Sequence, residues 1–231
     1  MTEPRLIIFD FDGTLADSQD TIATAMDEAF RYLGHIPPER EKTLSIVGLS
    51  LIEAMQVLVP DAESEFHKNL AEEYKAAFYR EVSSPGHVEP LYDGARDAIL
   101  KLSAEPHTLL GIATGKSQRG VRRVLDAHGL VEHFITIQTA DDAPSKPHPA
   151  MIHQAIAATG IEAGNTLMIG DTSYDIEMAH RAEVYSAAVS WGYHPEEHLC
   201  ALEPHIFARD FEQLLADIDG LIHGAPEKTI G

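Results

Sequence analysis

Residues 6–14 of the chain have the sequence Leu-Ile-Ile-Phe-Asp-Phe-Asp-Gly-Thr. The four consecutive apolar residues 6–9 predict a short buried strand. Asp10 and Asp12 follow directly, and alternate residues of an extended chain point the same way, so both carboxylates can serve one site. Gly13 lets the chain turn sharply and approach a ligand closely. The stretch therefore predicts a strand that delivers two acidic groups to a site at its end.

Outward from this stretch, short apolar runs alternate with amphipathic segments. Runs typical of buried strands occupy residues 108–114, 134–138, 166–170, 185–189 and 205–208. Segments with helical periodicity occupy residues 94–103, 120–128, 149–159, 175–182 and 211–221. Strands that alternate with helices of this length predict an α/β fold with a parallel sheet covered on both faces.

Residues 17–83 break this alternation, because they show helical patterns and no convincing strand. Apolar residues recur on one helical face in two sets: Ile22, Met26, Phe30 and Leu33, then Phe66, Leu70, Tyr74 and Phe78. The chain of 231 residues is long enough for a large domain with a smaller one. We predict a core of residues 1–16 and 84–231, interrupted after its first strand by a helical bundle of residues 17–83.

Six polar residues share one structural property, since each ends or follows a predicted strand. They are Asp10, Asp12, Thr114, Lys146, Asp171 and Asp175. The carboxyl ends of parallel strands lie at the same edge of a sheet, where open α/β folds build their ligand sites. We therefore expect the six side chains to converge there.

The acidic members of this set predict a metal ion. Asp171 could instead cap a helix with Asp175 in its first turns, although a cap needs only one Asp. An EF-hand calcium loop is excluded for Asp10 and Asp12, because Thr14 stands where that loop requires Asp. Carboxylates gathered on one rim repel each other unless a cation is bound or some are protonated. Oxygen ligands without His or Cys favour Mg²⁺.

The remaining two members suit an anion. Thr114, with Gly115, offers a hydroxyl and backbone N–H groups at a strand end, where a phosphate can bind. A P-loop is excluded, because that motif needs Gly at position 110 and the chain has Leu110. Lys146 is followed by Pro-His-Pro, whose prolines stiffen the loop. An ordinary surface lysine is the alternative for Lys146.

The charge of the chain limits its partners. Lys and Arg number 17 against 37 Asp and Glu, which gives a net charge of −20. Nucleic acid and anionic membranes would repel such a chain unless it carried a local basic patch. The densest basic stretch holds Lys116, Arg119, Arg122 and Arg123, whose spacing predicts the solvated face of one helix. A bound metal is thus the expected source of positive charge for an anionic substrate.

Further features bear on location. No apolar run approaches the ~20 residues of a membrane helix, and the first residues do not have the pattern of a signal peptide. Cys200 is the single cysteine, so it forms no internal disulfide, which fits a reducing compartment. We expect a cytoplasmic protein without membrane or nucleic-acid partners.

Together and in this order, the motifs resemble those of the haloacid dehalogenase superfamily. The match is carried by Asp10-Phe11-Asp12-Gly13-Thr14, Thr114, Lys146 in Lys-Pro-His-Pro, and Gly170-Asp171 followed by Asp175. The resemblance covers nearly the whole chain. It implies a Rossmann-like core and a helical cap formed by the inserted bundle.

The resemblance implies Mg²⁺-dependent phosphoryl transfer through an aspartyl-phosphate. Asp10 would be the nucleophile, and Asp12 the general acid and then the general base. The metal would be held by the Asp10 side chain, the Asp12 backbone carbonyl and Asp171, with Asp175 as a ligand or an orienting group. Thr114 and Lys146 would bind the phosphate oxygens.

Within the superfamily, the chain resembles the phosphoglycolate-phosphatase-like branch. Dehalogenases proper do not need Asp12, because a halide leaves without a proton. Members similar to β-phosphoglucomutase carry Arg in a cap motif Gly-x-Ser-Arg, and this chain has Leu51 there. Many relatives have Asn where this chain has Gly115, so we expect its phosphate-binding site to differ in shape from theirs.

Two further segments each allow two interpretations, and for a third segment a zinc-protease site is excluded. Residues 48–50 form either the loop that meets the substrate or a plain turn between helices. Residues 191–193 either line the crevice or pack into the core. His194 and His198 lack the His-Glu-x-x-His order of zinc proteases.

We therefore expect a phosphoric monoester hydrolase that acts on a small phosphorylated metabolite, with phosphoglycolate as the first candidate, as a monomer or homodimer. A pyrophosphatase or a sugar-phosphate mutase of the same superfamily is the alternative. A non-catalytic binding protein is a weaker one, because the motif residues are intact.

Overall fold

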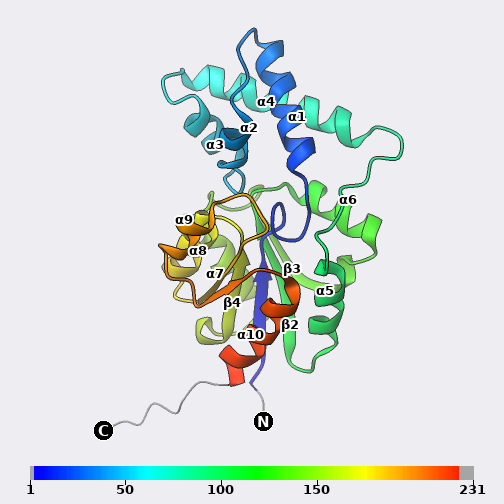
Figure 1. The fold of residues 1–231 in the computed structure, drawn as a ribbon, viewed down its shortest axis with the longest axis vertical. Coiled ribbons are helices and arrows are strands. Elements are labelled where there is room, and N and C mark those ends of the chain that lie inside the picture. Colours follow the sequence, from blue (N-terminus) through cyan, green and yellow to red (C-terminus); the bar gives the residue numbers. More distant parts are fainter. Residues whose placement is uncertain (1–2, 224–231) are drawn as a thin grey trace.

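The computed structural model describes residues 3–223, which form one parallel sheet with helices on both sides and a separate group of helices at one end (Figure 1). The strands are β1 (Arg5–Phe9), β2 (Thr108–Thr114), β3 (Phe134–Thr139), β4 (Thr166–Gly170), β5 (Tyr185–Val189) and β6 (Ile206–Ala208). Their order in the sheet is β3-β2-β1-β4-β5-β6, and every pairing is parallel. The predicted α/β class is confirmed.

Helices cover both faces of the sheet because alternate strand residues point to opposite faces. One face packs on α5 (Ala95–Ala104), α6 (Gln118–His128) and α10 (Phe211–His223), and the other on α7 (Ala150–Thr159) and α8 (Ser173–Arg181). In β1, Ile7 and Phe9 belong to the first of these apolar cores, and Leu6 and Ile8 to the second. The short helix α9 (Glu196–Cys200), which the sequence patterns do not predict, packs beside α8.

The helical insert lies between β1 and β2 in sequence and at the end of the molecule away from the start of β1 and from α10 (Figure 1). It consists of α1 (Gln19–Tyr32), α2 (Arg40–Leu44), α3 (Leu51–Leu58) and α4 (Ser64–Val82). Its own apolar core contains Met26, Phe30, Met55 and Leu70. The predicted insert is confirmed, whereas the exact domain boundaries, 16/17 and 83/84, stay a prediction.

The chain enters and leaves the insert at one place. The backbone N–H of Asp17 donates to the carbonyl oxygen of Pro90 at 2.9 Å, and that of Tyr92 donates to Leu15 at 3.0 Å. These paired segments lie just beyond the carboxyl end of β1, so both connections to the insert pass beside the predicted site.

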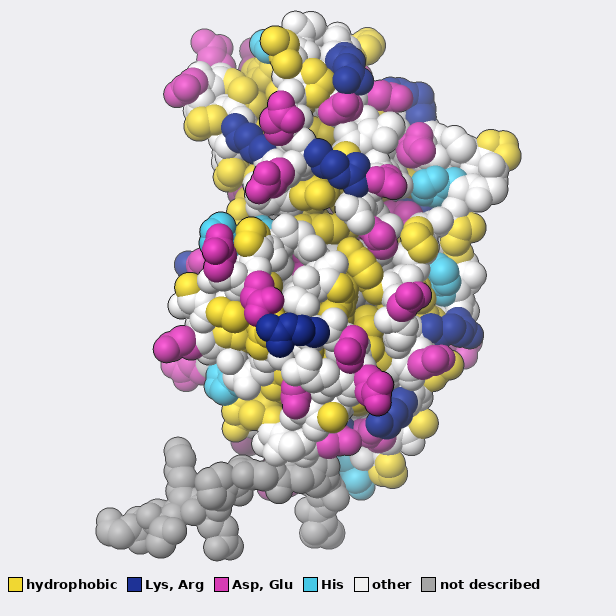
Figure 2. All heavy atoms as spheres, viewed as in Figure 1, with side chains coloured by type: hydrophobic (Ala, Val, Ile, Leu, Met, Phe, Trp, Pro, Cys, Tyr) yellow, Lys and Arg dark blue, Asp and Glu magenta, His cyan; other side chains and the backbone are white. Residues whose placement is uncertain are grey.

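Charged side chains are dispersed on the face drawn in Figure 2, where Lys and Arg lie among Asp and Glu. Among the described residues, no helix is long and apolar enough to cross a membrane.

Candidate active site

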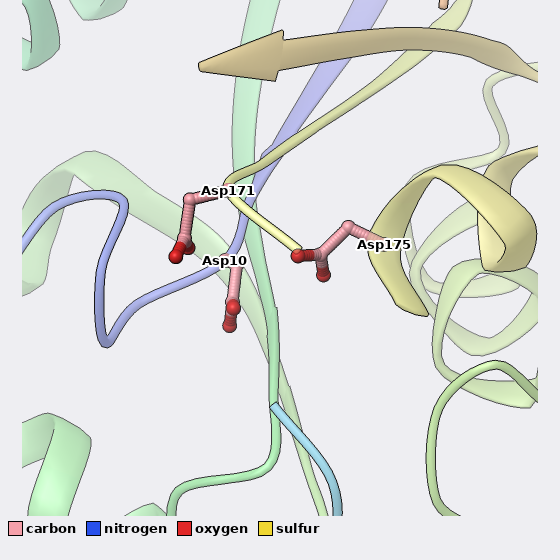
Figure 3. Close-up of side chains that lie close together, drawn as sticks. All are labelled: Asp10, Asp171 and Asp175. Carbon is pink, nitrogen blue, oxygen red and sulfur yellow. The ribbon is translucent and has the colours of Figure 1, made fainter. Parts of the chain in front are cut away.

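Three carboxylates meet at the carboxyl edge of the sheet, as Figure 3 shows. Asp10 follows β1, Asp171 follows the adjacent β4, and Asp175 lies in the first turn of α8. One oxygen of each lies within 4.8 Å of the others, and all three side chains are buried. The predicted convergence of these residues is confirmed.

Asp175 shapes the start of α8. Thr172 is the N-cap, and its backbone N–H and side-chain hydroxyl donate to Oδ2 of Asp175 at 3.1 and 2.7 Å. Thr172 and Asp175 thus form a capping box. The alternative in which Asp171 caps this helix is wrong. The side chain of Asp171 instead belongs to the carboxylate group with Asp10 and Asp175.

Lys146 lies inside the carboxylate group. Its Nζ is 2.8 Å from Oδ1 of Asp10 and 2.6 Å from Oδ1 of Asp175, and its side chain is fully buried. The surface-lysine alternative is therefore wrong. Burial favours the neutral amine, but the ion pairs with Asp10 and Asp175 outweigh it and raise the pKa of Lys146.

The carboxylate of Asp171 is enclosed by backbone. Its Oδ1 accepts a hydrogen bond from Thr14 Oγ1 and its Oδ2 accepts one from the backbone N–H of Tyr193, both at 2.8 Å. A Cβ atom at either Gly13 or Gly192 would lie 2.3 Å from Oδ2 of Asp171. Gly13 also has φ of +89°, which glycine adopts without strain. The two glycines therefore admit Asp171 to the site.

The charge balance of the group fits a divalent cation. When ionised, Asp10, Asp171 and Asp175 carry three negative charges, and Lys146 supplies one positive charge. Neither oxygen of Asp10 accepts a well-formed hydrogen bond from a described residue. Burial raises the pKa of Asp10 to about 7, with Lys146 opposing and Asp175 adding to the shift. Burial, Asp10 and Asp175 raise the pKa of Asp171.

These pKa shifts mean that the ionised group is costly to bury as it stands. A bound Mg²⁺ would neutralise the remaining charge and use oxygen ligands, which is the chemistry that this ion prefers. Asp10 and Asp171 would hold the metal, and Asp175 either holds it or orients Lys146.

The side chain of Asp12 lies apart from this group. Its Oδ1 accepts hydrogen bonds from Ser18 Oγ and from Lys116 Nζ, the latter at 2.8 Å. The Asp12 carboxylate is thus paired with a cation of its own, and the contribution of its backbone carbonyl to a metal stays a prediction.

The position of Lys116 contradicts its predicted place on a solvated helix face. It precedes α6, which begins at Gln118, and its side chain is only 6% exposed, so it does not share the solvated helix face predicted for it. Its Nζ also lies 3.1 Å from Oε1 of Glu89. Burial lowers the pKa of Lys116, but Asp12 and Glu89 outweigh this effect and raise it.

Glu89 is a site residue that the sequence patterns miss. Its carboxylate is fully buried between Lys116 and Arg123. The segment between α4 and α5 that carries Glu89 has no periodicity, so nothing local marks it. Lys116, in contrast, follows β2 by two positions, and this closeness to a strand end is the signal that could have found it.

Thr114 ends β2 and is buried, with its Oγ1 accepting from the backbone N–H of Lys116 at 3.2 Å. At Gly115, a Cβ atom would lie 2.6 Å from the carbonyl oxygen of Leu49 and 2.7 Å from that of Gly48. The absence of a side chain at Gly115 therefore allows the insert to touch the end of β2.

The contact is made by residues 45–50, which we call the insert loop. The backbone N–H of Ser50 donates to Ser145 Oγ at 2.8 Å. The carbonyl oxygen of Ser45 accepts from Tyr174 OH at 3.3 Å and from His194 Nε2 at 3.0 Å. The insert loop is thus seated on the core at three points, which supports the substrate-facing interpretation of residues 48–50.

A cavity of about 870 Å³ lies between the insert and the edge of the sheet. Its lining includes Asp10, Asp12, Thr114 and Lys116 from the core, and Met26, Val47, Leu49, Tyr74 and Phe78 from the insert. Of the side chains predicted to share an apolar face of α4, Tyr74 and Phe78 therefore line this cavity, whereas Leu70 is in the core of the insert.

The segment after β5 supports the site rather than lining the cavity. Trp191 packs on Phe211, and its Nε1 donates to the carbonyl oxygen of Thr14 at 3.0 Å. His194 Nδ1 accepts from the backbone N–H of Ser173 at 3.1 Å, while Nε2 donates to the insert loop. The core-packing interpretation of Trp191 is confirmed.

A family model described as haloacid dehalogenase-like hydrolase matches residues 7–189. A probable phosphatase of Dickeya dadantii, IndB, is 33% identical over 221 residues, which are 94% of each chain. A phosphoglycolate phosphatase of Vibrio parahaemolyticus is 29% identical and a pyrophosphatase of Listeria monocytogenes, PpaX, is 30% identical, each over 91% of this chain and 94% of its own.

Solved structures share the fold. A haloacid dehalogenase-like hydrolase from Streptococcus pneumoniae superposes with a TM-score of 0.82 over 94% of this chain and 100% of its own, at 23% identity. This similarity concerns the fold alone.

Proposed function

The chain belongs to the haloacid dehalogenase-like hydrolase family, and on that premise we propose that it is a Mg²⁺-dependent phosphatase of a small phosphorylated metabolite. The observation that carries the proposal is the buried group of Asp10, Asp171 and Asp175, in which Lys146 pairs with Asp10 and Asp175 and both Asp10 oxygens lack a well-formed hydrogen bond. Asp10 lines the cavity, and its one printed partner is the ammonium group of Lys146, so its carboxylate is placed as a nucleophile would be.

Two chemical steps follow from this arrangement. An oxygen of Asp10 attacks phosphorus in line, and the bond to the leaving oxygen breaks while Asp12 gives that oxygen a proton. Water then attacks the phosphoryl group on Asp10, Asp12 takes a proton from the water, and inorganic phosphate and the free carboxylate result. The balance is one ester and one water converted to one alcohol and one phosphate.

The surrounding residues divide the remaining work. Mg²⁺, when bound, supplies positive charge between the nucleophile and the phosphate and so reduces their repulsion. Lys146 is held by Asp10 and Asp175 where it can neutralise an equatorial oxygen. The hydroxyl of Thr114 would donate to another oxygen, since it lies at the end of the adjacent strand.

The insert, residues 17–83 in our proposal, acts as a cap that excludes water and selects the leaving group. Phosphoglycolate is the first substrate to test, since a phosphoglycolate phosphatase is among the relatives. A pyrophosphatase of equal similarity supports pyrophosphate as the second candidate. Leu51, which lines the cavity where a mutase would place its arginine, disfavours a mutase.

A panel of phosphate esters with Mg²⁺ tests the proposal. We expect phosphate release from phosphoglycolate or another small monoester, and none after Asp10→Asn. Phosphate release from pyrophosphate alone would replace the ester with the second candidate. Isomerised products without phosphate would indicate a mutase, and binding without any turnover would indicate the non-catalytic alternative.

A further inference from the structure

Lys116 is a buried cation in the cavity that neither the metal group nor the proposed phosphate-binding site uses. Its Nζ lies 2.8 Å from Oδ1 of Asp12 and 3.1 Å from Oε1 of Glu89. Lys146, the other buried lysine of the site, contacts a different pair, Asp10 and Asp175. The two carboxylates proposed to act on the substrate therefore each have their own ammonium group.

Glu89 holds Lys116 in place from the segment that leaves the insert. Its side chain is fully buried, and Arg123 of α6 pairs with its second oxygen. Its backbone carbonyl accepts from His128 Nε2 at 2.9 Å, which ties the same residue to the end of α6. Asp12 and Glu89 on one side, and Lys116 and Arg123 on the other, form a group whose charges balance. A buried carboxylate needs such partners, so Glu89 and Lys116 hold each other in place.

The ion pair with Lys116 helps to orient the carboxylate of Asp12. Ser18 Oγ and Lys116 Nζ both donate to Oδ1. Among the described residues, no hydrogen bond or ion pair involves Oδ2. Two donors thus fix the orientation of the carboxyl group through one oxygen, and the other oxygen is available to exchange a proton.

We propose that Lys116 is a positioning residue for Asp12: anchored by Glu89, it fixes Oδ1 so that Oδ2 gives and takes the proton in the two chemical steps. This inference rests on the proposed function, in which Asp12 is the general acid and base. The competing role for Lys116 is recognition of a second anionic group on the substrate, and the experiment below separates the two.

The experiment compares leaving groups. Ethyl phosphate needs a proton on its leaving oxygen, 4-nitrophenyl phosphate does not, and phosphoglycolate adds a carboxylate. The value of kcat/KM reports the first phosphoryl transfer, so it is measured for all three with the parent protein, Lys116→Met, Asp12→Asn and the double variant. Lys116→Arg tests rescue by a retained cation, and Lys101→Met, an exposed change of the same type on α5, is the matched control.

We expect Lys116→Met to lose about 10²-fold in kcat/KM with ethyl phosphate and much less with 4-nitrophenyl phosphate. With the latter, kcat and KM should fall together, because water attack then limits turnover. In the Asp12→Asn background, Lys116→Met should change kcat/KM by no more than about twofold. Lys116→Arg should recover part of the loss, and Lys101→Met should match the parent. The ratio between substrates does not depend on the folded fraction, so partial misfolding leaves the test intact.

Equal losses with ethyl and 4-nitrophenyl phosphate would overturn the inference, as would losses that multiply in the double variant. A loss confined to phosphoglycolate would assign Lys116 to the substrate carboxylate instead. If Asp12→Asn itself kept the parent's kcat/KM with ethyl phosphate, the proposed role of Asp12 would fail, and this inference with it. The Glu89→Gln variant weakens the anchor but keeps Lys116, so its loss in kcat/KM should depend on the leaving group in the same way, to a smaller degree. A loss in Glu89→Gln that does not depend on the leaving group would show that Glu89 does not anchor Lys116.

Discussion

Nζ of Lys146 lies 2.8 Å from Oδ1 of Asp10, and both side chains are buried. A cation of the protein therefore touches the proposed nucleophile before any metal binds. Lys146→Met should remove a positive charge from the transition state and lower kcat/KM by about 10²–10³-fold. It should also lower the melting temperature most in metal-free protein, because the carboxylates then lose their one lysine. Activity within twofold of the parent, measured beside the Lys101→Met control, would contradict this role.

The stabilisation of the fold by Mg²⁺ should increase as pH rises. The pKa of Asp10 is about 7 in the folded metal-free protein against an ordinary value of 3.8, and that of Asp171 is also raised. Between about pH 4 and pH 7 the folded state therefore binds more protons than the unfolded state. The stability supplied by protonated Asp10 is present below about pH 4 and is lost as pH rises through about 7. Asp171 changes the stability in the same direction.

Saturating Mg²⁺ should therefore raise the melting temperature more at pH 7.5 than at pH 5, because it replaces protons that are lost. Thermal unfolding at both pH values, with EDTA or with Mg²⁺, measures this difference. Asp10→Asn is the control and should reduce the difference. A metal effect that is the same at both pH values would show that these carboxylates do not bind the ion, as would full activity in excess EDTA.

Asp171 and Asp175 should respond differently to the same substitution. Oδ2 of Asp175 already accepts two hydrogen bonds from Thr172, and its Oδ1 pairs with Lys146, so we expect it to orient the site. Asp175→Asn should destabilise metal-free protein by up to about 2 kcal/mol, because it disturbs the capping box with Thr172, and should weaken Mg²⁺ binding about 10–100-fold.

Asp171→Asn should weaken Mg²⁺ binding further than Asp175→Asn does, with a smaller effect on the metal-free fold. Isothermal titration and thermal unfolding separate the two effects. A larger loss of Mg²⁺ affinity in Asp175→Asn would make Asp175 the principal ligand.

Gly115 should control the seating of the insert loop. In Gly115→Ala, the new Cβ would lie within 2.7 Å of two carbonyl oxygens, and backbone yields less readily than a side chain. We expect a destabilisation of about 1–3 kcal/mol and a raised KM, since residues 48–50 must move away from the cavity. Gly164→Ala, where a Cβ meets nothing within 4 Å, is the control. Unchanged stability and KM in Gly115→Ala would show that the loop contact is dispensable.

Much of this site could be predicted from the sequence because its residues follow apolar strands directly. Asp10 and Asp171 each come one position after a strand, and neighbouring parallel strands bring such positions together without further information. The class of the fold and the insert were predictable for the same reason, since period and composition change at residue 17.

What could not be predicted depends on contacts between distant residues. Glu89 meets Arg123 and Lys116 only because the segment that returns from the insert packs against α6 and the residues just before it. The roles of Asp171 and Thr172 at the start of α8 could not be predicted either, because Asp is at least as good an N-cap as Thr by residue type. The role of Gly115 could not be predicted either, because the sequence shows only that it differs from related motifs. In the structure, Gly115 allows the insert loop to approach the end of β2.

The central claim is that Asp10 carries the phosphoryl group and Asp12 moves the protons. Rapid-quench kinetics with 4-nitrophenyl phosphate tests it most directly, because that leaving group departs without a proton. Asp12→Asn should release about one equivalent of nitrophenolate in a burst and then stall, with phosphate trapped on Asp10, since the hydrolysis of the phosphoenzyme lacks its base. Asp10→Asn should give no burst and no labelled protein. A burst with labelled protein in Asp10→Asn, or steady turnover in Asp12→Asn at the parent's rate, would contradict the account.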